Sequence, residues 1–526
     1  MKRRSFLKGA AGGVLAWTAG APAIAQAPRV LKYIPQANLT SLDPIWTTAT
    51  VTTIHGYHVY DVLYGVDAQF RPKPQMAEGH TVSDDNRTWT IKLRSGLKFH
   101  DGEPVRAQDC IASIRRWAAR DSAAQIMMRS VDAINAADDR TIEIKLKRPF
   151  GALLDVLGKG QAQVCFIMPE RVAARTDPMQ QVTDFTGSGP CKFVREEFVS
   201  GSKVVYTRNP DYVPRQEPAE NMAGGKVMHF DRVEWTVIPD PATAAAAIQA
   251  GEVDWLERPT FDLLPVLRRN RNIQLVDVNT TGEYAMMRFN HLHPPFDKVG
   301  VRRAVMMAVD QEDYLRAVIG DDTQVWRTCT SWFPCGTPYG TEIAGNPLTG
   351  ARNIDAAKAA LTAAGYNGEK VIVVSPTDQP TLHPLGLMTE SVLRRLGMNV
   401  EFVATDWGTV VQRRAMREPG AWSIFHTTWS GISLINPLFN PTLRGNGAEA
   451  WFGWPTDARI EELHTAWAAA PNAEAQTRIA LEIQQRAFET VPLVPLGMWN
   501  LPHVLRRSVT GVVKGITTVP WNIRRV

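Results

Sequence analysis

The stretch from residue 352 to residue 404 constrains the fold most strongly, because it combines helical and strand-like hydrophobic patterns in a short space. Helical spacing predicts a helix over Asp355–Ala364, and a continuous apolar run predicts a buried strand over Val371–Val374. A second helix is predicted over 385–396 and a second strand over Asn399–Val403. A strand, a helix and a strand joined by short links form a unit whose two strands run parallel and are covered by helices. We therefore expect an α/β fold.

Other segments predict half-buried strands and a helix with clear caps. Residues 89–93 and 142–146 alternate apolar and polar side chains, as strands with one wet face do. Asp240 and Pro241 predict the start of a helix that ends at Gly251. A chain of 526 residues is too long for one core, so we expect two or three domains. No low-complexity linker separates them, which favours domains built from discontinuous segments.

The first 25 residues have the plan of an export signal. Residues 2–8 read KRRSFLK, a mildly apolar run covers 9–21, and Ala-Ile-Ala at 23–25 is a small-residue cleavage site. The arginine pair resembles a twin-arginine signal, although Lys2 stands where Ser or Thr is usual. We expect cleavage near Ala25 and a periplasmic protein. An ordinary secretory leader with a chance arginine pair would lead out of the cytoplasm as well.

The net charge of +5 comes mostly from this leader. It holds Lys2, Arg3, Arg4 and Lys8 and no acidic residue, so the rest of the chain has a net charge of +1. That balance does not favour nucleic acid or an anionic membrane surface as a partner. Downstream of the leader, no uncharged apolar run reaches the roughly 18 residues that a membrane-spanning helix needs.

The five cysteines suggest one disulfide and no metal site. Export permits disulfides, and Cys329 and Cys335 flank the short loop-like stretch Thr-Ser-Trp-Phe-Pro, so we predict a bond between them. Cys110, Cys165 and Cys191 lie in apolar or glycine-turn settings and are interpreted as small buried residues. No C-x-x-C pair is present, so we expect no metal bound by cysteine and no cofactor.

A series of motifs follows in a fixed order along most of the chain after the leader. The longest is DNRTWTIKLRSGLKFHDG at 85–102. The others are AEG at 77–79, AQD at 107–109, GSGP at 187–190, RNPDY at 208–212, AGEVD at 250–254, PFD at 295–297, VRRA at 301–304, AVD at 308–310, TDW at 405–407 and VPLVPL at 491–496. Together they closely resemble the bacterial extracellular solute-binding proteins of the peptide/nickel class.

The resemblance implies a type II periplasmic-binding-protein fold with two α/β lobes, an extra subdomain and a hinge of two strands. Lobe I would take residues 26–60, 188–283 and 495–526. The extra subdomain would take 61–187, and lobe II would take 284–494. The lobes would close on a small solute held between them. The protein, expected to be a monomer, would then deliver this solute to the membrane permease of an ABC importer.

The segment FHTTWSGI at 425–432 is the most informative about the solute. In peptide binders of this family, an Asp three residues after the Trp pairs with the α-ammonium of the ligand. Ile432 holds that position here, and Ser433 stands where those proteins often carry Tyr. Because a buried ammonium needs a counter-charge, we expect ordinary di- and oligopeptides to bind weakly. A carboxylate from another loop would restore their binding, and Asp406 is the nearest candidate in sequence.

The same resemblance suggests which residues line the solute site. Trp429 matches the aromatic residue of the cleft, although packing between the lobes would explain it equally well. Trp46 falls in the first ligand-contacting segment of the family, and Tyr284 lies at the expected first crossing between lobes. His426 and Ile432 complete the predicted set of ligand-binding residues.

Two other functions remain open. A secreted hydrolase would need a nucleophile beside a base, and no nucleophile motif is visible, so we expect no enzyme. A metal-chelate or haem carrier would need His426, His55 and His58 in one cleft. The alternative to a metal site is that His55 and His58 have a structural role and line the core or the cleft.

Overall fold

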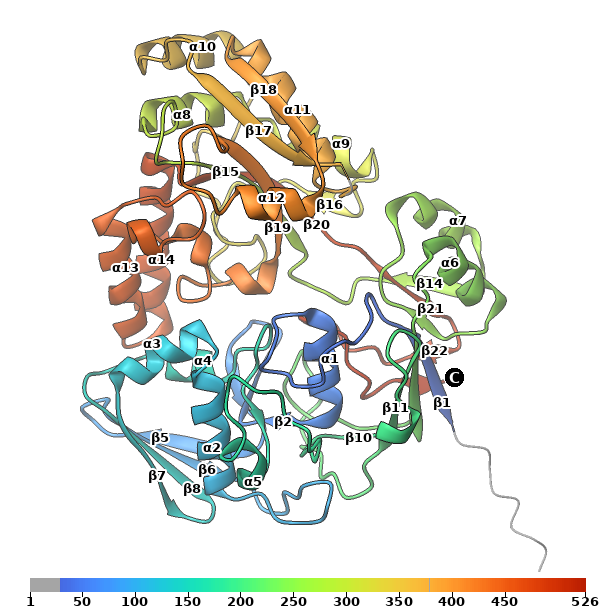
Figure 1. Cartoon of the computed structure of the whole chain (residues 1–526). Coiled ribbons are helices and arrows are strands. Elements are labelled where there is room, and N and C mark those ends of the chain that lie inside the picture. Colours follow the sequence, from blue (N-terminus) through green and yellow to red (C-terminus); the bar gives the residue numbers. More distant parts are fainter. Residues whose placement is uncertain (1–28, 378) are drawn as a thin grey trace, which may run out of the picture.

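The computed structural model describes residues 29–526 except residue 378. The predicted export signal at 1–25 lies outside the described residues. The chain forms two lobes, one below and one above in Figure 1, each built on its own main sheet. We call them the seven-stranded lobe and the six-stranded lobe.

The seven-stranded sheet is assembled from segments far apart in the sequence. In spatial order its strands are β10 (Cys191–Phe193), β11 (Lys203–Arg208), β12 (Arg232–Thr236), β1 (Val30–Ile34), β13 (Trp255–Leu256), β21 (His503–Arg506) and β14 (Ile273–Val276). β1 runs parallel to β12 and β13, and the remaining neighbours are antiparallel. The helices α1 (Thr50–Val59), α6 (Pro241–Ala250) and α7 (Leu264–Arg269) belong to this lobe.

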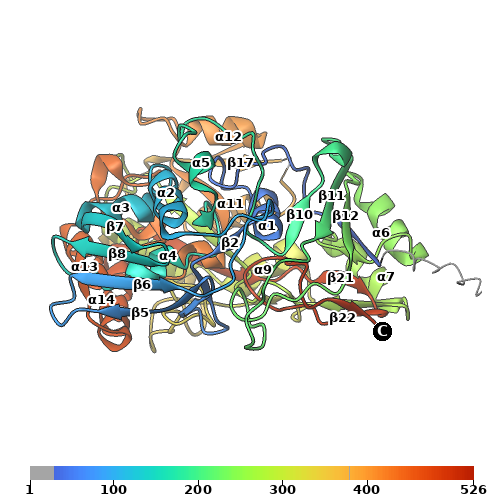
Figure 2. The ribbon, with the colours of Figure 1, turned by 90° about the horizontal axis from the view of Figure 1, so that it is seen from below.

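A second, antiparallel sheet lies beside the first in the same lobe, as the view from below shows (Figure 2). Its strands, in spatial order, are β5 (Ala77–Val82), β6 (Thr88–Leu93), β8 (Thr141–Leu146) and β7 (Val131–Asp138). The helices with it are α2 (Ala107–Ala118), α3 (Ser122–Ser130), α4 (Leu153–Leu157) and α5 (Glu170–Ala173). The short hairpin of β3 (Tyr64–Val66) and β4 (Pro72–Pro74) precedes this sheet.

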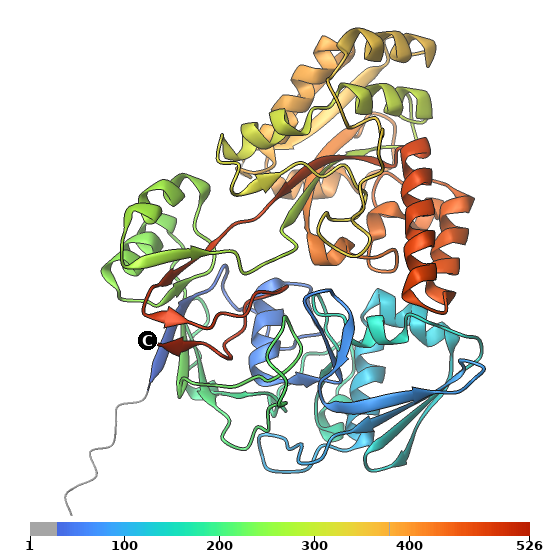
Figure 3. The ribbon, with the colours of Figure 1, turned by 180° about the vertical axis from the view of Figure 1, so that it is seen from behind.

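The six-stranded sheet forms the core of the upper lobe. Its strands, in spatial order, are β16 (Trp326–Arg327), β20 (Leu493–Trp499), β15 (Glu283–Phe289), β19 (Ile424–Ser430), β17 (Lys370–Pro376) and β18 (Asn399–Thr405). The lobe also holds α8 (Val299–Ala308), α9 (Gln311–Ile319), α10 (Ile354–Ala363), α11 (His383–Arg395) and α12 (Trp407–Arg413). α13 (Ala458–Ala469) and α14 (Ala473–Thr490) form a helical pair that reaches down toward α3 (Figures 1 and 3).

The chain passes from one main sheet to the other twice, between β14 and β15 and again between β20 and β21 (Figure 3). The first passage falls at the predicted limit near residue 283. The second follows Trp499, because β20 continues in the six-stranded sheet beyond residue 494. The domain limits themselves stay a prediction.

The elements predicted from sequence period and caps are present. β17 and β18 run parallel along seven paired residues with α11 between them in sequence, as predicted for a strand–helix–strand unit. α6 begins where the Asp240 carboxylate accepts a hydrogen bond from the Thr243 amide at 2.7 Å, and it ends at Gly251, whose φ is 78°. In β6 the apolar residues Trp89, Ile91 and Leu93 are buried, as their alternation indicates.

The cysteines lie as the sequence suggests. Cys329 and Cys335 form a disulfide, with their Cα atoms 5.8 Å apart. Cys110, Cys165 and Cys191 are buried free thiols, and burial raises the pKa of each.

Candidate functional site

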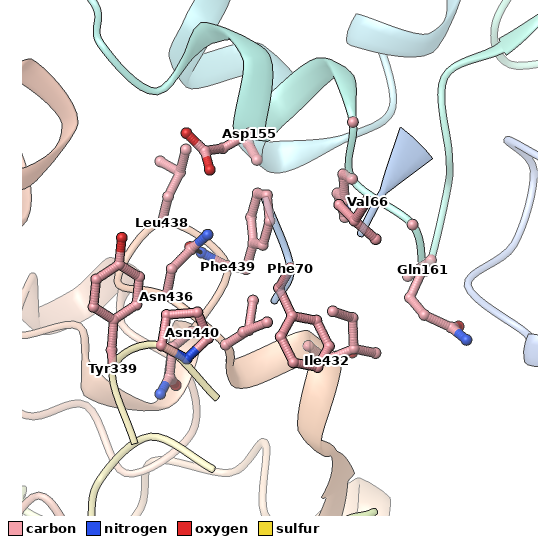
Figure 4. A pocket seen from close by; sticks show the side chains of 18 of the residues that line it. Val66, Phe70, Asp155, Gln161, Tyr339, Ile432, Asn436, Leu438, Phe439 and Asn440 are labelled. Carbon is pink, nitrogen blue, oxygen red and sulfur yellow. Dashed lines mark hydrogen bonds between the residues drawn. The ribbon is translucent and has the colours of Figure 1, made fainter. Parts of the chain in front are cut away.

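A cavity of about 1130 Å³ lies between the two lobes. The seven-stranded lobe contributes the β3–β4 turn, the start of α3 and the segment from α4 to residue 163. The six-stranded lobe contributes most residues of 428–441, four residues between 444 and 451, the start of α14 and part of the loop after the disulfide. Because both lobes form its walls, the cavity is the place where a solute would contact both at once (Figure 4).

Aromatic rings line much of this cavity. Trp429 lies at the end of β19, with its ring edge-on to Trp451 at 5.6 Å between centroids. Phe70 and Phe439 come from opposite lobes, and Figure 4 shows both beside the cavity. Tyr339 follows the disulfide loop, and its hydroxyl donates a hydrogen bond to Gln476 Oε1 at 3.2 Å. Such rings offer a solute a large apolar contact area.

Three residues that line the cavity have a backbone conformation that is unfavourable outside glycine. Phe70, Ala162 and Gln163 have φ values of 60°, 45° and 51°. The Phe70 turn is held by the Asp67 carboxylate, which accepts hydrogen bonds from the amides of Gln69 and Arg71, each at 2.9 Å. A left-handed conformation costs a non-glycine residue about 1 kcal/mol, and such strain gathers at ligand sites.

The charged groups of the cavity fall into paired and unpaired sets. Lys159 forms an ion pair with Asp121 and lies 5.7 Å from the Phe439 ring of the other lobe. Arg444 Nε donates to Glu461 Oε1 at 2.9 Å. Among the described residues, the half-buried Asp155 carboxylate on α4 has no ion-pair partner, and its one hydrogen bond is to its own backbone amide. Burial raises the pKa of Asp155 to about 6.

Two of the five predicted ligand-binding residues, Trp429 and Ile432, line the cavity. Both follow from the segment 425–432, which leaves the sheet at Ser430 and turns into a short 3-10 helix at Gly431–Leu434. The structure therefore brings together the aromatic ring and the apolar side chain that the sequence places three residues apart.

The other three predicted residues lie outside the cavity wall. His426 is fully buried within the six-stranded lobe, where its Nε2 is 2.7 Å from Thr389 Oγ1. Tyr284 is buried in β15 and donates its hydroxyl to the Ser331 carbonyl at 2.7 Å. Trp46 is half-buried, with the Arg120 guanidinium 5.1 Å from its ring centroid. Trp46 stays near the site, since Thr48 and Thr50 line the cavity.

The histidines considered for a metal chelate lie in separate interiors. His55 and His58 are buried on α1, where His55 Nδ1 is 2.9 Å from the Tyr206 hydroxyl. Burial lowers the pKa of His55 to about 3 and that of His426 to about 3, so both are neutral. No group of three or more metal-ligating side chains occurs in the part of the chain that the structure describes.

Sequence reasoning missed Phe70, Asp155 and Tyr339, which line the cavity. The sequence does mark Asp155 as unusual, because it is the one charged residue in the apolar run ALLDVL at 152–157. Phe70 and Tyr339 lie in turns whose position depends on the packing of the lobes, so nothing in the local pattern marks them. Asp406, the acid nearest the site in sequence, caps α12 by accepting from the Thr409 amide at 3.0 Å and does not line the cavity.

The two lobes and the cavity between them define a two-lobed periplasmic-binding-protein fold. The binding protein AgaA with agropinic acid from A. tumefaciens R10 aligns with a TM-score of 0.74 at 20% identity, over 94% of this chain and 99% of that one. The dipeptide-binding protein of Pseudoalteromonas sp. SM9913 in complex with Met-Leu aligns with a TM-score of 0.74 at 20% identity, over 95% and 100% of the two chains.

The sequence narrows this class to one family. The profile described as bacterial extracellular solute-binding proteins, family 5 middle, matches residues 71–450. The probable peptide ABC transporter periplasmic-binding protein y4tO of Sinorhizobium fredii is 38% identical over 493 residues, which are 93% of this chain and 92% of that protein. The chain belongs to the bacterial extracellular solute-binding proteins, family 5. Such proteins bind small solutes for ABC importers and work with permease subunits.

Proposed function

We propose that this protein captures a small organic solute of about peptide size in the cavity between its lobes and delivers it to the permease of an ABC importer. The main support for this proposal is the cavity. Both lobes line it, and its wall combines aromatic rings with a few polar groups, as the walls of ligand sites generally do. The name of y4tO and the Met-Leu and agropinic acid complexes support a peptide or another small organic molecule as the solute.

The protein would act as a monomer in the periplasm. Residues 2–8 carry the twin-arginine-like motif, which supports export by that route. Among residues 29–526, apart from 378, no helix is long and apolar enough to cross a bilayer.

We further propose that the protein performs no chemistry on its solute. Two contacts between a Ser or Thr hydroxyl and a histidine could suggest a nucleophile and its base, Ser375 with His383 at 3.0 Å and Thr389 with His426 at 2.7 Å. Both hydroxyl residues are fully buried and neither lines the cavity, so a bound solute would not reach them.

Native mass spectrometry of protein purified from the periplasm tests the proposed function. We expect a population of the protein with a bound small molecule that is released on denaturation, and tandem spectra would identify it. Adding this molecule back to stripped protein should shift tryptophan fluorescence and raise the melting temperature. The proposal fails if no solute co-purifies and no compound of a broad metabolite panel changes either signal.

A further inference from the structure

The Asp155 carboxylate lines the cavity without a positively charged partner among the described residues. It lies on α4, a helix of five residues, and its carboxylate faces the cavity between Leu438 and Val66 in Figure 4. Lys159 lies four residues further on but pairs with Asp121 instead. The Tyr339 hydroxyl, across the cavity, already donates to Gln476.

The other charged groups of the cavity are either paired or exposed. Lys159 pairs with Asp121, Arg71 with Asp67 and Arg444 with Glu461. Glu449 also lines the cavity without a partner among the described residues, but it is exposed to solvent, which stabilises its charge. Asp155, in contrast to Glu449, is half-buried. An ionised carboxylate that is partly removed from water is unfavourable unless a cation lies close to it.

We propose that Asp155 binds a positively charged nitrogen, an ammonium-type group, of the solute. This inference rests on the proposed function and names the chemical class of the solute. It also gives a reason why Ile432 can stand where related peptide binders have a carboxylate, because the counter-charge comes from the opposite lobe. Trp429 and Ile432 on one lobe would contact the apolar part of the solute, while Asp155 on the other lobe would hold its cation.

The pH dependence of binding follows from this arrangement. Burial raises the pKa of Asp155 to about 6, and a bound cation would lower it, so binding releases a proton near this pH. Affinity should therefore rise as the pH increases through about 6 and be lost as the pH falls below it. The other titratable groups that line the cavity are Arg71, Asp121, Lys159, Tyr339, Arg444 and Glu449. Tyr339 stays neutral in this range because burial raises its pKa.

Calorimetry with Asp155→Asn and the control Glu103→Gln, at an exposed residue outside the cavity, tests the inference. The probes are a panel of free dipeptides, the same dipeptides N-acetylated, amino sugars and polyamines, at pH 7.5 and pH 5. We expect one or more of the cationic probes to bind the wild type, and Asp155→Asn to weaken that binding about ten- to a hundredfold. Glu103→Gln should stay within about threefold, and Asp155→Glu should restore part of the affinity. The pH dependence should disappear in Asp155→Asn.

The melting temperature of Asp155→Asn separates a binding effect from misfolding. Since the carboxylate has no ion-pair partner and burial disfavours its charge, removing that charge should leave the stability of the free protein equal or higher at pH 7.5. Equal binding of a cationic probe by wild type and Asp155→Asn overturns the inference. Binding restricted to N-acetylated or otherwise uncharged probes overturns it too, while the proposed function stands. Binding of no probe, with no co-purified solute, overturns both.

Discussion

Trp429 lies where β19 leaves the six-stranded sheet, and its neighbours Thr428 and Ser430 line the cavity with it. The ring is partly exposed, and it packs edge-on against Trp451, which also lines the cavity. A ring held in this way loses little freedom when a solute packs on it, which is why such residues dominate binding energies.

Trp429→Ala should weaken binding of the co-purified solute by tenfold or more, because the variant loses the area of one aromatic ring. Trp46→Ala is the comparison, since Trp46 lies outside the cavity wall and should change affinity less. Calorimetric titration of both variants measures the difference. Unchanged affinity in Trp429→Ala, with a normal melting temperature, would remove Trp429 from the site.

The sequence could identify part of the site and not the rest, for physical reasons visible at single residues. Trp429 and Ile432 lie within one short segment, so a local motif was enough to place them. His426, three residues before Trp429, was also predicted to bind the solute. It lies in the middle of β19, where it is buried, whereas Trp429 lies near the end of the strand. Asp155 stands out in sequence only as the one charged residue of the apolar run 152–157, and its place on the cavity wall depends on how the two lobes pack.

Among the helices and strands, helix-capping residues and hydrophobic periodicity predicted β6, β8, α6 and the β17–α11–β18 unit well. Each of these is formed by residues that are neighbours in sequence. The walls of the cavity depend instead on turns and loops. Two of them offer direct tests, the disulfide loop and the turn before α4.

The loop closed by Cys329 and Cys335 leads directly to Gly336, Pro338 and Tyr339 on the cavity wall. Replacing both cysteines by serine should lower the free energy of unfolding by about 2 kcal/mol, because the unfolded chain gains the freedom of a short loop. Solute affinity should fall by several-fold as Tyr339 becomes less fixed. Denaturant titration with and without reductant checks this, since reductant should destabilise the wild type and leave the variant unchanged. Equal stability of variant and wild type would contradict the expectation.

The turn before α4 touches the other lobe at a position where only glycine fits. A Cβ atom added to Gly151 would lie 2.1 Å from the backbone oxygen of Ala470, in the link between α13 and α14. Gly151→Ala should therefore hold the lobes apart at this contact, on the cavity wall, and weaken solute binding about tenfold. The control is Gly79→Ala, where an added Cβ has nothing within 4 Å.

Small-angle scattering with and without solute measures the effect of Gly151→Ala on lobe closure. The wild type and Gly79→Ala should become more compact on binding, and Gly151→Ala should do so less. If Gly151→Ala closed and bound like the wild type, the contact with Ala470 would have no role in closure.

For the whole molecule, two passages of the chain join lobes that meet at several separate points. Arg268 on α7 forms an ion pair with Asp322 of the other lobe, Lys159 reaches the Phe439 ring, and Gly151 meets Ala470. Between these contacts lies the cavity. A molecule built in this way can change its cavity by rotating one lobe against the other while both cores stay intact.

A crystal structure of the protein purified with its own solute would show where the solute binds and which group Asp155 holds. We expect electron density for the solute in the cavity between the lobes, in contact with the Trp429 ring, and with a basic nitrogen at about 2.7–3.2 Å from the Asp155 carboxylate. Density for the solute anywhere outside this cavity would refute both the proposed binding site and the role of Asp155. A solute in the cavity without a basic nitrogen at Asp155 would retain the binding function and refute the role of Asp155.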